Sequence, residues 1–150
     1  MDVVEKLSLD LFTEARKFVS LGRLNQKMID FIIERKPDLK NILSPEKDII
    51  FWEDRISHTE RHRDDFMSDL EYELCFENIP NIIHQPDYIS VHPKDNSISF
   101  IKDFSSHVSV AVRISGGGKM SFRTMYPIMD AQLENYMDKG LAWRYESEVN

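Results

Sequence analysis

The chain has one cysteine, five glycines and no long apolar run, and each shortage excludes a class of protein. The single Cys75 rules out an internal disulfide and a zinc site built from several cysteines. It stands between Leu74 and Phe76, an apolar setting that favours a small core residue over a nucleophile. No stretch approaches the roughly 20 apolar residues that a membrane helix needs. The N-terminus is acidic and amphipathic rather than like a signal peptide, so we expect a cytoplasmic protein without membrane contact.

The overall amino-acid composition is that of a globular domain. Its 150 residues suit one compact unit, and 41% hydrophobic with 30% charged residues excludes a disordered chain. The net charge of −7 argues against broad affinity for nucleic acid. The charge is uneven, however, because the segment from Ile98 to Ile128 holds four cations and one carboxylate, Asp103. Such a basic surface can steer one polyanion, although solvated charges on exposed strand faces would give the same pattern.

Helical spacing of apolar residues marks four segments. The predicted helices span residues 3–21, 24–35, 53–77 and 128–138. Gly22 and Pro37 end the first two, which would form an N-terminal helical hairpin. The acidic start of the third suits the positive end of a helix dipole.

Between these helices the apolar period changes to two. This alternation predicts strands at 88–92, 97–104, 107–115 and 120–126. Their short links require antiparallel pairing. A short apolar run at 49–52 predicts an edge strand. Helices followed by strands indicate an α+β fold, in which N-terminal helices pack on a four-stranded antiparallel sheet and a C-terminal helix follows.

The spacing of His58 and His62 is the most informative feature of the chain. Residues four apart on a helix share one face. Histidine titrates near neutral pH and serves as acid or base without extreme tuning. Next to a sheet edge with Arg123, Thr124 and Tyr126, the two imidazoles would make a site that moves protons and holds a phosphate. A pair of surface or core histidines would show the same spacing.

A metal site is an alternative for this pair, with Asp64 or Asp65 as a carboxylate ligand. The zinc-protease motif needs Glu directly after the first histidine, where Thr59 stands here. A metal-dependent hydrolase is nevertheless one hypothesis for the function of the chain.

Other motifs favour structural roles. The three glycines at 116–118 precede a strand rather than a helix, so we interpret them as a flexible hairpin and not a phosphate loop. His84, His92 and His107 each stand alone in turns or at strand ends, and we interpret them as exposed or capping residues.

Four sequence elements then occur in a characteristic order. They are the histidine pair in Ile56–His62, the Ile-Pro-x-Ile-Ile-x-x-Pro-Asp-x-Ile pattern at 79–89, a strand with a lysine at 97–102, and Arg-Thr-Met-Tyr at 123–126. In this arrangement the stretch from Phe51 to Pro127 resembles the phage-associated nucleases of the barnase–EndoU–colicin–RelE group. The resemblance divides the chain into the helical hairpin at 1–48 and a nuclease domain at 49–150.

The resemblance implies RNA cleavage without a metal or other cofactor. A ribose 2′-OH attacks the adjacent phosphodiester and leaves a 2′,3′-cyclic phosphate and a free 5′-OH. The implied catalytic residues are His58, His62, Lys102, Thr124 and Tyr126. The implied substrate-binding residues are Arg113, Lys119 and Arg123. Strict alternation puts Phe122, Thr124 and Tyr126 on one face and turns Arg123 away, so their convergence needs a bulge or twist near Pro127.

The expected partner is RNA, with tRNA as one candidate, and a toxin of phage or mobile-element origin would also have a cognate antitoxin or immunity protein. The alternative is a non-catalytic module on the same scaffold. It would bind a protein partner in an immunity or regulatory role, through its acidic helices.

Overall fold

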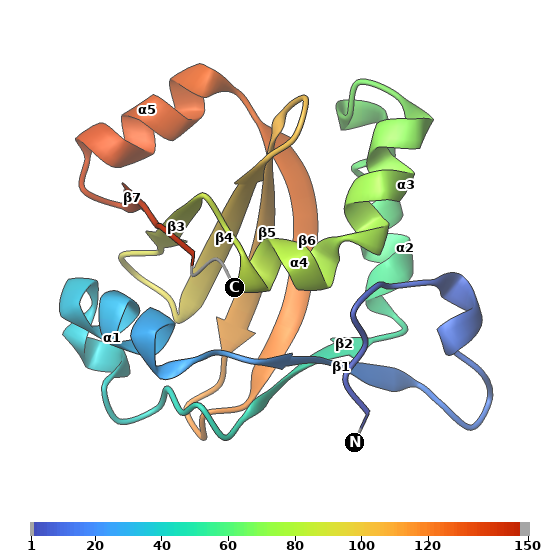
Figure 1. The fold of residues 1–150 in the computed structure, drawn as a ribbon, viewed down its shortest axis with the longest axis horizontal. Helices are drawn as coiled ribbons and strands as arrows, with labels where there is room; N and C mark the ends of the chain where they lie inside the picture. Colours follow the sequence, from blue (N-terminus) through green and yellow to red (C-terminus); the bar gives the residue numbers. More distant parts are fainter. Residues whose placement is uncertain (1, 148–150) are drawn as a thin grey trace.

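The computed structural model describes residues 2–147, which form one seven-stranded mixed sheet with helices interspersed along the chain (Figure 1). The strands are β1 (Phe18–Arg23), β2 (Asp48–Trp52), β3 (Tyr88–Val91), β4 (Ser97–Asp103), β5 (His107–Ile114), β6 (Met120–Ile128) and β7 (Ala142–Arg144). Their order across the sheet is β1-β2-β6-β5-β4-β3-β7. β2 and β6 run parallel, whereas the other neighbours are antiparallel.

Five α-helices connect or cover these strands. They are α1 (Gln26–Arg35), α2 (Arg55–Glu60), α3 (Asp69–Glu77), α4 (Ile79–His84) and α5 (Asp130–Asp138), with 3-10 turns at Leu9–Leu11, Pro37–Leu39 and Arg63–Asp65. Each helix within the described residues is too short or too polar to cross a lipid bilayer.

The predicted N-terminal helices and four-stranded antiparallel sheet are therefore wrong. Only the helix at 24–35 of the expected hairpin exists, as α1. The segment 3–21, expected as the first helix, contains no α-helix: it has a 3-10 turn at Leu9–Leu11, and its end enters β1, in which Val19 and Leu21 are buried in the core. Residues two apart share one face of a strand but lie on nearly opposite sides of a helix, so the burial of both Val19 and Leu21 fits the strand, which pairs with β2.

The run 49–52 is also not an edge strand, because β2 lies between β1 and β6. The edge next to β3 is formed by β7, which comes from the C-terminal tail. The four strands expected from alternation are all present as β3 to β6, and the last helix is present as α5.

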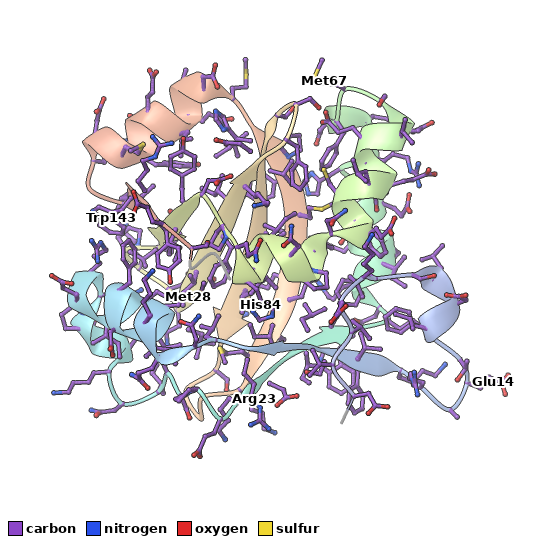
Figure 2. The ribbon with its side chains drawn as sticks, in the orientation of Figure 1. Glu14, Arg23, Met28, Met67, His84 and Trp143 are labelled. Carbon is purple, nitrogen blue, oxygen red and sulfur yellow. The ribbon has the colours of Figure 1, made fainter. Side chains whose placement is uncertain are left out.

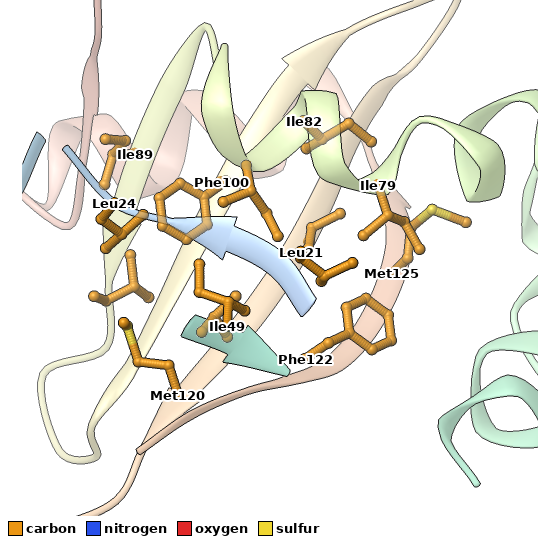
Figure 3. Close-up of a cluster of buried hydrophobic side chains, with 14 of the residues drawn as sticks. Leu21, Leu24, Ile49, Ile79, Ile82, Ile89, Phe100, Met120, Phe122 and Met125 are labelled. Carbon is orange, nitrogen blue, oxygen red and sulfur yellow. The ribbon is translucent and has the colours of Figure 1, made fainter. Parts of the chain in front are cut away.

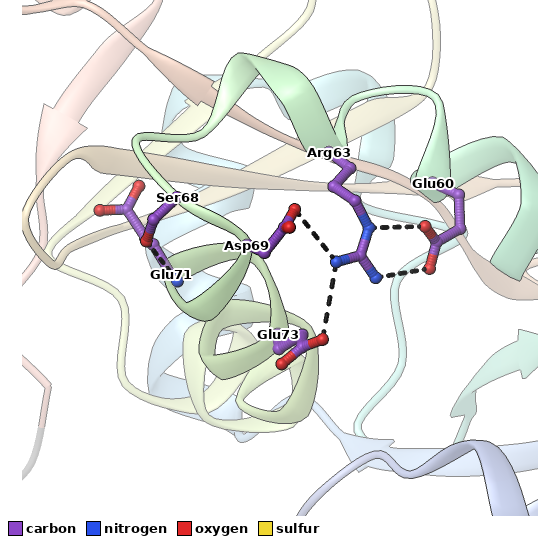
Figure 4. Close-up of polar contacts among 6 residues, drawn as sticks. All are labelled: Glu60, Arg63, Ser68, Asp69, Glu71 and Glu73. Carbon is purple, nitrogen blue, oxygen red and sulfur yellow. Dashed lines mark hydrogen bonds and ion pairs between the residues drawn. The ribbon is translucent and has the colours of Figure 1, made fainter.

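The long helix expected at 53–77 is broken into α2, a 3-10 turn and α3. Phe66 and Ser68 have extended backbone angles, and the Ser68 side chain caps α3 by accepting from the Glu71 N–H at 3.1 Å. Figure 4 shows this cap beside Arg63, whose guanidinium bridges both carboxylate oxygens of Glu60 and reaches across to α3. These polar contacts fold the segment back on itself.

The core lies on the face of the sheet covered by α1 and α4. Leu21, Ile49 and Phe100 from three strands meet Ile79 and Ile82 from α4 (Figure 3). Burying these side chains contributes roughly 1.5–3 kcal/mol each.

Cys75 and His84 have structural roles in or near this core. Cys75 is fully buried, and burial followed by the charge of Glu71 raises the pKa of its thiol to about 12. It is therefore an inert core residue, as expected. His84 points from α4 toward β1, where its Nε2–H donates to the Leu21 carbonyl oxygen at 2.6 Å (Figure 2).

Candidate functional site

A β-bulge in β6 sets the geometry of the site. The pairing of β6 with β5 skips one residue, Arg123. As a result Phe122 and Met125, three residues apart, both enter the core (Figure 3). Thr124 and Tyr126 consequently face away from the core, on what we call the outer face of the sheet. Strict alternation is thus wrong for Phe122, and the bulge lies at Arg123 rather than near Pro127.

Helix α2 lies beside β6 at the point where β2 stops pairing with it. The last register pair of β2 and β6 is Ile50 with Ser121, which leaves the bulged backbone of β6 without a strand neighbour on that side. The Arg55 guanidinium donates to the Arg123 carbonyl oxygen, at 2.9 Å from Nε. The hydroxyl of Thr59 donates back to the carbonyl of Arg55 at 2.9 Å. The Arg55 bond satisfies the carbonyl of the bulged residue and joins α2 to β6, whereas the Thr59 bond lies within α2.

The two histidines then stand against the outer face of β6. The ring centroids of His58 and His62 are 6.2 Å apart, and those of His62 and Tyr126 are 5.8 Å apart. His62 lies just beyond the end of α2, and its Nδ1 is 3.0 Å from Asp65 Oδ2. A proton on Nδ1, donated to this carboxylate, leaves Nε2 to exchange protons with a ligand.

His58 has a different electrostatic environment. Burial lowers the pKa of His58 below its usual value, and the cations Arg55 and Arg61 lower it further, as do His62 and Arg123. Its imidazole is therefore neutral at pH 7 and able to accept a proton. The same cations would attract a phosphate group to its side.

A cavity of about 770 Å³ opens between His62, Tyr126 and the β4–β5 hairpin. His107 stands across this cavity, with its Nδ1 bonded to Asp103 and its Nε2 to Asp130 at the start of α5. Burial lowers the pKa of His107, but the hydrogen bonds and charges of the two carboxylates outweigh it and raise the pKa above its usual value. The two carboxylates thus favour the protonated form of His107, in which they would accept from both of its N–H groups.

Two hydroxyls complete the outer face near β6. Burial raises the pKa of Tyr126, while a hydrogen bond from Ser109 acts in the opposite direction. Tyr126 therefore stays protonated at neutral pH. The Thr124 hydroxyl is covered and has no hydrogen-bond partner within residues 2–147. It can donate to a ligand only when that ligand displaces the side chains above it.

The structure brings together five of the residues singled out from the sequence and separates three. The group at the bulge comprises His58, His62, Arg123, Thr124 and Tyr126. Lys102 lies on the core side of the sheet, where its Nζ donates to the Gln85 carbonyl at 2.7 Å. Arg113 and Lys119 line grooves further along the outer face. The part of the chain that the structure describes contains no cluster of three His, Cys, Asp or Glu side chains suited to a metal ion.

Sequence reasoning missed His107, which we had interpreted as a capping or exposed residue. A signal was present, because Asp103 and His107 flank a tight hairpin and form a cross-strand pair on one face. The contribution of Asp130 had no such signal, since it depends on where α5 packs.

We compared the sequence with models of known protein families. Residues 28–135 match the model of the family described as phage-Barnase-EndoU-ColicinE5/D-RelE like nuclease3. The chain belongs to this family. The match runs from α1 into α5 and includes every residue of the group at the bulge, which confirms the resemblance identified from the sequence. No curated protein and no solved structure matches the chain. The family makes nucleic acid the expected class of substrate.

Proposed function

We propose that the protein is an endoribonuclease that cleaves RNA by attack of a ribose 2′-OH on the adjacent phosphodiester. The observation that carries this proposal is the contact of His62 with both Asp65 and Tyr126, with the second imidazole of His58 next to it. Two imidazoles with different surroundings match the need of this reaction for one base and one acid.

In this mechanism His58 is the base. Its imidazole, kept neutral by burial and by neighbouring cations, takes the proton of the 2′-OH. The 2′-oxygen forms a bond to phosphorus, and the bond from phosphorus to the 5′-oxygen breaks. His62, held by Asp65, gives a proton to the departing 5′-oxygen. The products are a 2′,3′-cyclic phosphate and a free 5′-OH, and no metal is required.

The phosphate is held at the bulge. Arg55 and Arg123 are among the cations whose charges act on His58. The guanidinium of Arg123 suits a phosphate because it can donate two parallel hydrogen bonds. Tyr126 is placed to stack on a base or to donate its hydroxyl, and Thr124 to donate to a non-bridging oxygen. Cleavage of tRNA by a phage-associated toxin with a cognate inhibitor is the biological setting that we propose.

The test is cleavage of RNA by His62→Ala in the presence of EDTA. Loss of general acid catalysis lowers a rate by roughly 10²- to 10⁴-fold, so we expect a fall of that size with unchanged thermal stability. His92→Ala is the matched control, since His92 is exposed in the β3–β4 turn and does not line the cavity. Fragments must carry 2′,3′-cyclic phosphate ends. Undiminished cleavage by His62→Ala would refute the assigned role.

One observation favours the alternative of a protein-binding module. Met67, Leu70 and Leu74 around α3 are 75%, 75% and 49% exposed, and a row of apolar side chains on a surface helix is typical of an interface. Figure 2 shows Met67 projecting from the surface. If the purified protein cleaves none of several RNA classes, this hypothesis takes precedence.

A further inference from the structure

The outer face of the sheet carries a second concave surface, at the opposite end from the cavity of His62. One groove of about 520 Å³ lies over β1, β2 and β6, and a neighbouring one of about 380 Å³ reaches toward α2. Both are lined by Trp52, Arg113 and Ser121, so they form one continuous surface. We call it the Trp52 groove, after its largest exposed side chain.

An aromatic pair forms the floor at one end of the Trp52 groove. Phe18 and Trp52 are partners in the β1–β2 register, and their ring centroids are 4.8 Å apart. The two side chains are 37% and 45% exposed, which is unusual for aromatic residues with a core directly beneath their strands. Rings held by strand pairing offer a flat apolar surface whose shape is fixed before a ligand arrives.

Cations without partners line the sides of the groove. Arg113, Lys119 and Arg123 make no side-chain hydrogen bond or ion pair within residues 2–147. The groove also includes Lys47 and Arg55. Against these five cations it has two carboxylates, and one of them, Asp48, already pairs with Arg23 outside the groove at 2.7 Å. An acidic protein thus keeps a patch of uncompensated positive charge beside exposed aromatic rings.

We propose that the Trp52 groove binds a single-stranded stretch of RNA that continues from the phosphate held at the bulge. This inference rests on the proposed function and identifies the form of its substrate. A base stacks on the Trp52 and Phe18 rings, while the backbone phosphates pair with Arg113 and Lys119. Alternating stacking surfaces and cations are how proteins hold single strands without reading sequence. A duplex is excluded from this contact because its bases are already stacked on each other.

The groove leads directly to the proposed catalytic group. Arg55 and Arg123 line its near end, and the charges of both act on His58. A strand lying in the groove therefore delivers its next phosphate to the imidazoles. The substrate is consequently a loop or an unpaired end of a structured RNA rather than a helix.

Binding is tested with the full chain carrying His62→Ala, so that the probe is not cut. The probe is a fluorescein-labelled single-stranded RNA of about twelve nucleotides, followed by anisotropy at low salt. Stacking of one base is worth roughly 1–3 kcal/mol in alanine substitutions, so Trp52→Ala should weaken binding about 5- to 150-fold. Trp52→Phe keeps a stacking ring and should keep most of the affinity. Leu74→Ala is the control, because Leu74 is equally exposed and lies on α3.

The salt dependence supplies an independent readout. Each phosphate contact contributes about −0.7 to the slope of log affinity against log salt for single strands. Replacing both Arg113 and Lys119 by Gln should therefore reduce the magnitude of the slope by about 1.4. Replacing the exposed Lys94 by Gln, in the β3–β4 turn, should leave the slope unchanged.

Several outcomes overturn the inference. Equal affinity of wild type and Trp52→Ala would remove the stacking contact, and equal affinity for the same RNA in duplex form would do so as well. Competition by heparin with equal strength in both variants would assign the patch to a simple polyanion or an acidic protein. If RNA binds as expected but the wild-type chain cuts none, the groove stands and the proposed catalysis fails. If the wild-type chain cuts a dinucleotide while Trp52→Ala binds the long probe normally, only the groove fails.

Discussion

Glu71 is expected to hold the β4–β5 hairpin against α3. Its removal should lower the free energy of unfolding substantially, although it lies outside the main core. The side chain is 8% exposed, and its carboxylate accepts from the hydroxyls of Ser105 and Ser106 in the hairpin turn. Hydrogen bonds to a charged group contribute roughly 1.5–3 kcal/mol. Since Ser105 is exposed and regains a water partner, we expect Glu71→Ala to cost about 2–3 kcal/mol in all. For a domain of this size that corresponds to a fall in Tm of roughly 5–10 °C.

Urea unfolding of wild type, Glu71→Ala and Glu73→Ala measures this cost. Glu73 lies on the same helix but is 63% exposed, with one ion pair to Arg63 at 3.6 Å, so its replacement should cost well under about 1 kcal/mol. A double-mutant cycle with Ser105→Ala should give a coupling free energy of about 1 kcal/mol. A Glu71 variant as stable as the Glu73 variant, or a coupling of zero, would show that the hairpin does not depend on this carboxylate.

Three further changes test the electrostatics and the backbone. Arg61→Gln should raise the pKa of His58, followed by NMR titration, because it removes one of the cations that lower it; an unmoved pKa would contradict this cause. Because the pKa of His107 is raised in the folded state, its protonation stabilises the fold fully below about pH 6.5, and this stabilisation is lost as the pH rises through the folded-state pKa. The Tm of wild type should therefore exceed that of His107→Gln by more at about pH 6 than at about pH 9. Gly22→Ala should lower the free energy of unfolding in urea more than Gly140→Ala does. Both glycines have a positive φ (95° and 70°), but a Cβ at Gly22 would stand 2.7 Å from Nε2 of His84 on α4.

The sequence predicted the centre of the sheet because alternation there is long and bounded by turns. β4 and β5, with seven and eight residues, give enough repeats to distinguish period two from 3.6. β1 and β7 have six and three residues, and too few apolar positions to do so. Their pairing is decided by contacts with β2 and β3, which lie far away in the chain.

Some features of the candidate site could likewise be predicted from local sequence and others could not. The closeness of His58 and His62 follows from local spacing, whereas the bulge at Arg123 depends on the register with β5 and leaves no mark in the sequence of β6. The position of Lys102 could have been foreseen, since it shares its strand face with Ile98 and Phe100, which are both fully buried. Its place on that face separates it from the group at the bulge, which lies on the outer face.

The distribution of charge on the outer face explains how an acidic chain could handle a polyanion. The carboxylates at the cavity pair with imidazoles, Asp65 with His62 and Asp130 with His107. In the Trp52 groove, by contrast, the side chains of Arg113, Lys119 and Arg123 have no hydrogen-bond or ion-pair partner within the described residues. Phosphates are therefore attracted to the groove end and repelled from the carboxylate end. The imidazoles of α2 stand at the border between the two. In the proposed reaction, a strand in the groove would be held on one side of the reacting phosphate only, so the fragment on the carboxylate side would have little to retain it once the bond to its 5′-oxygen breaks.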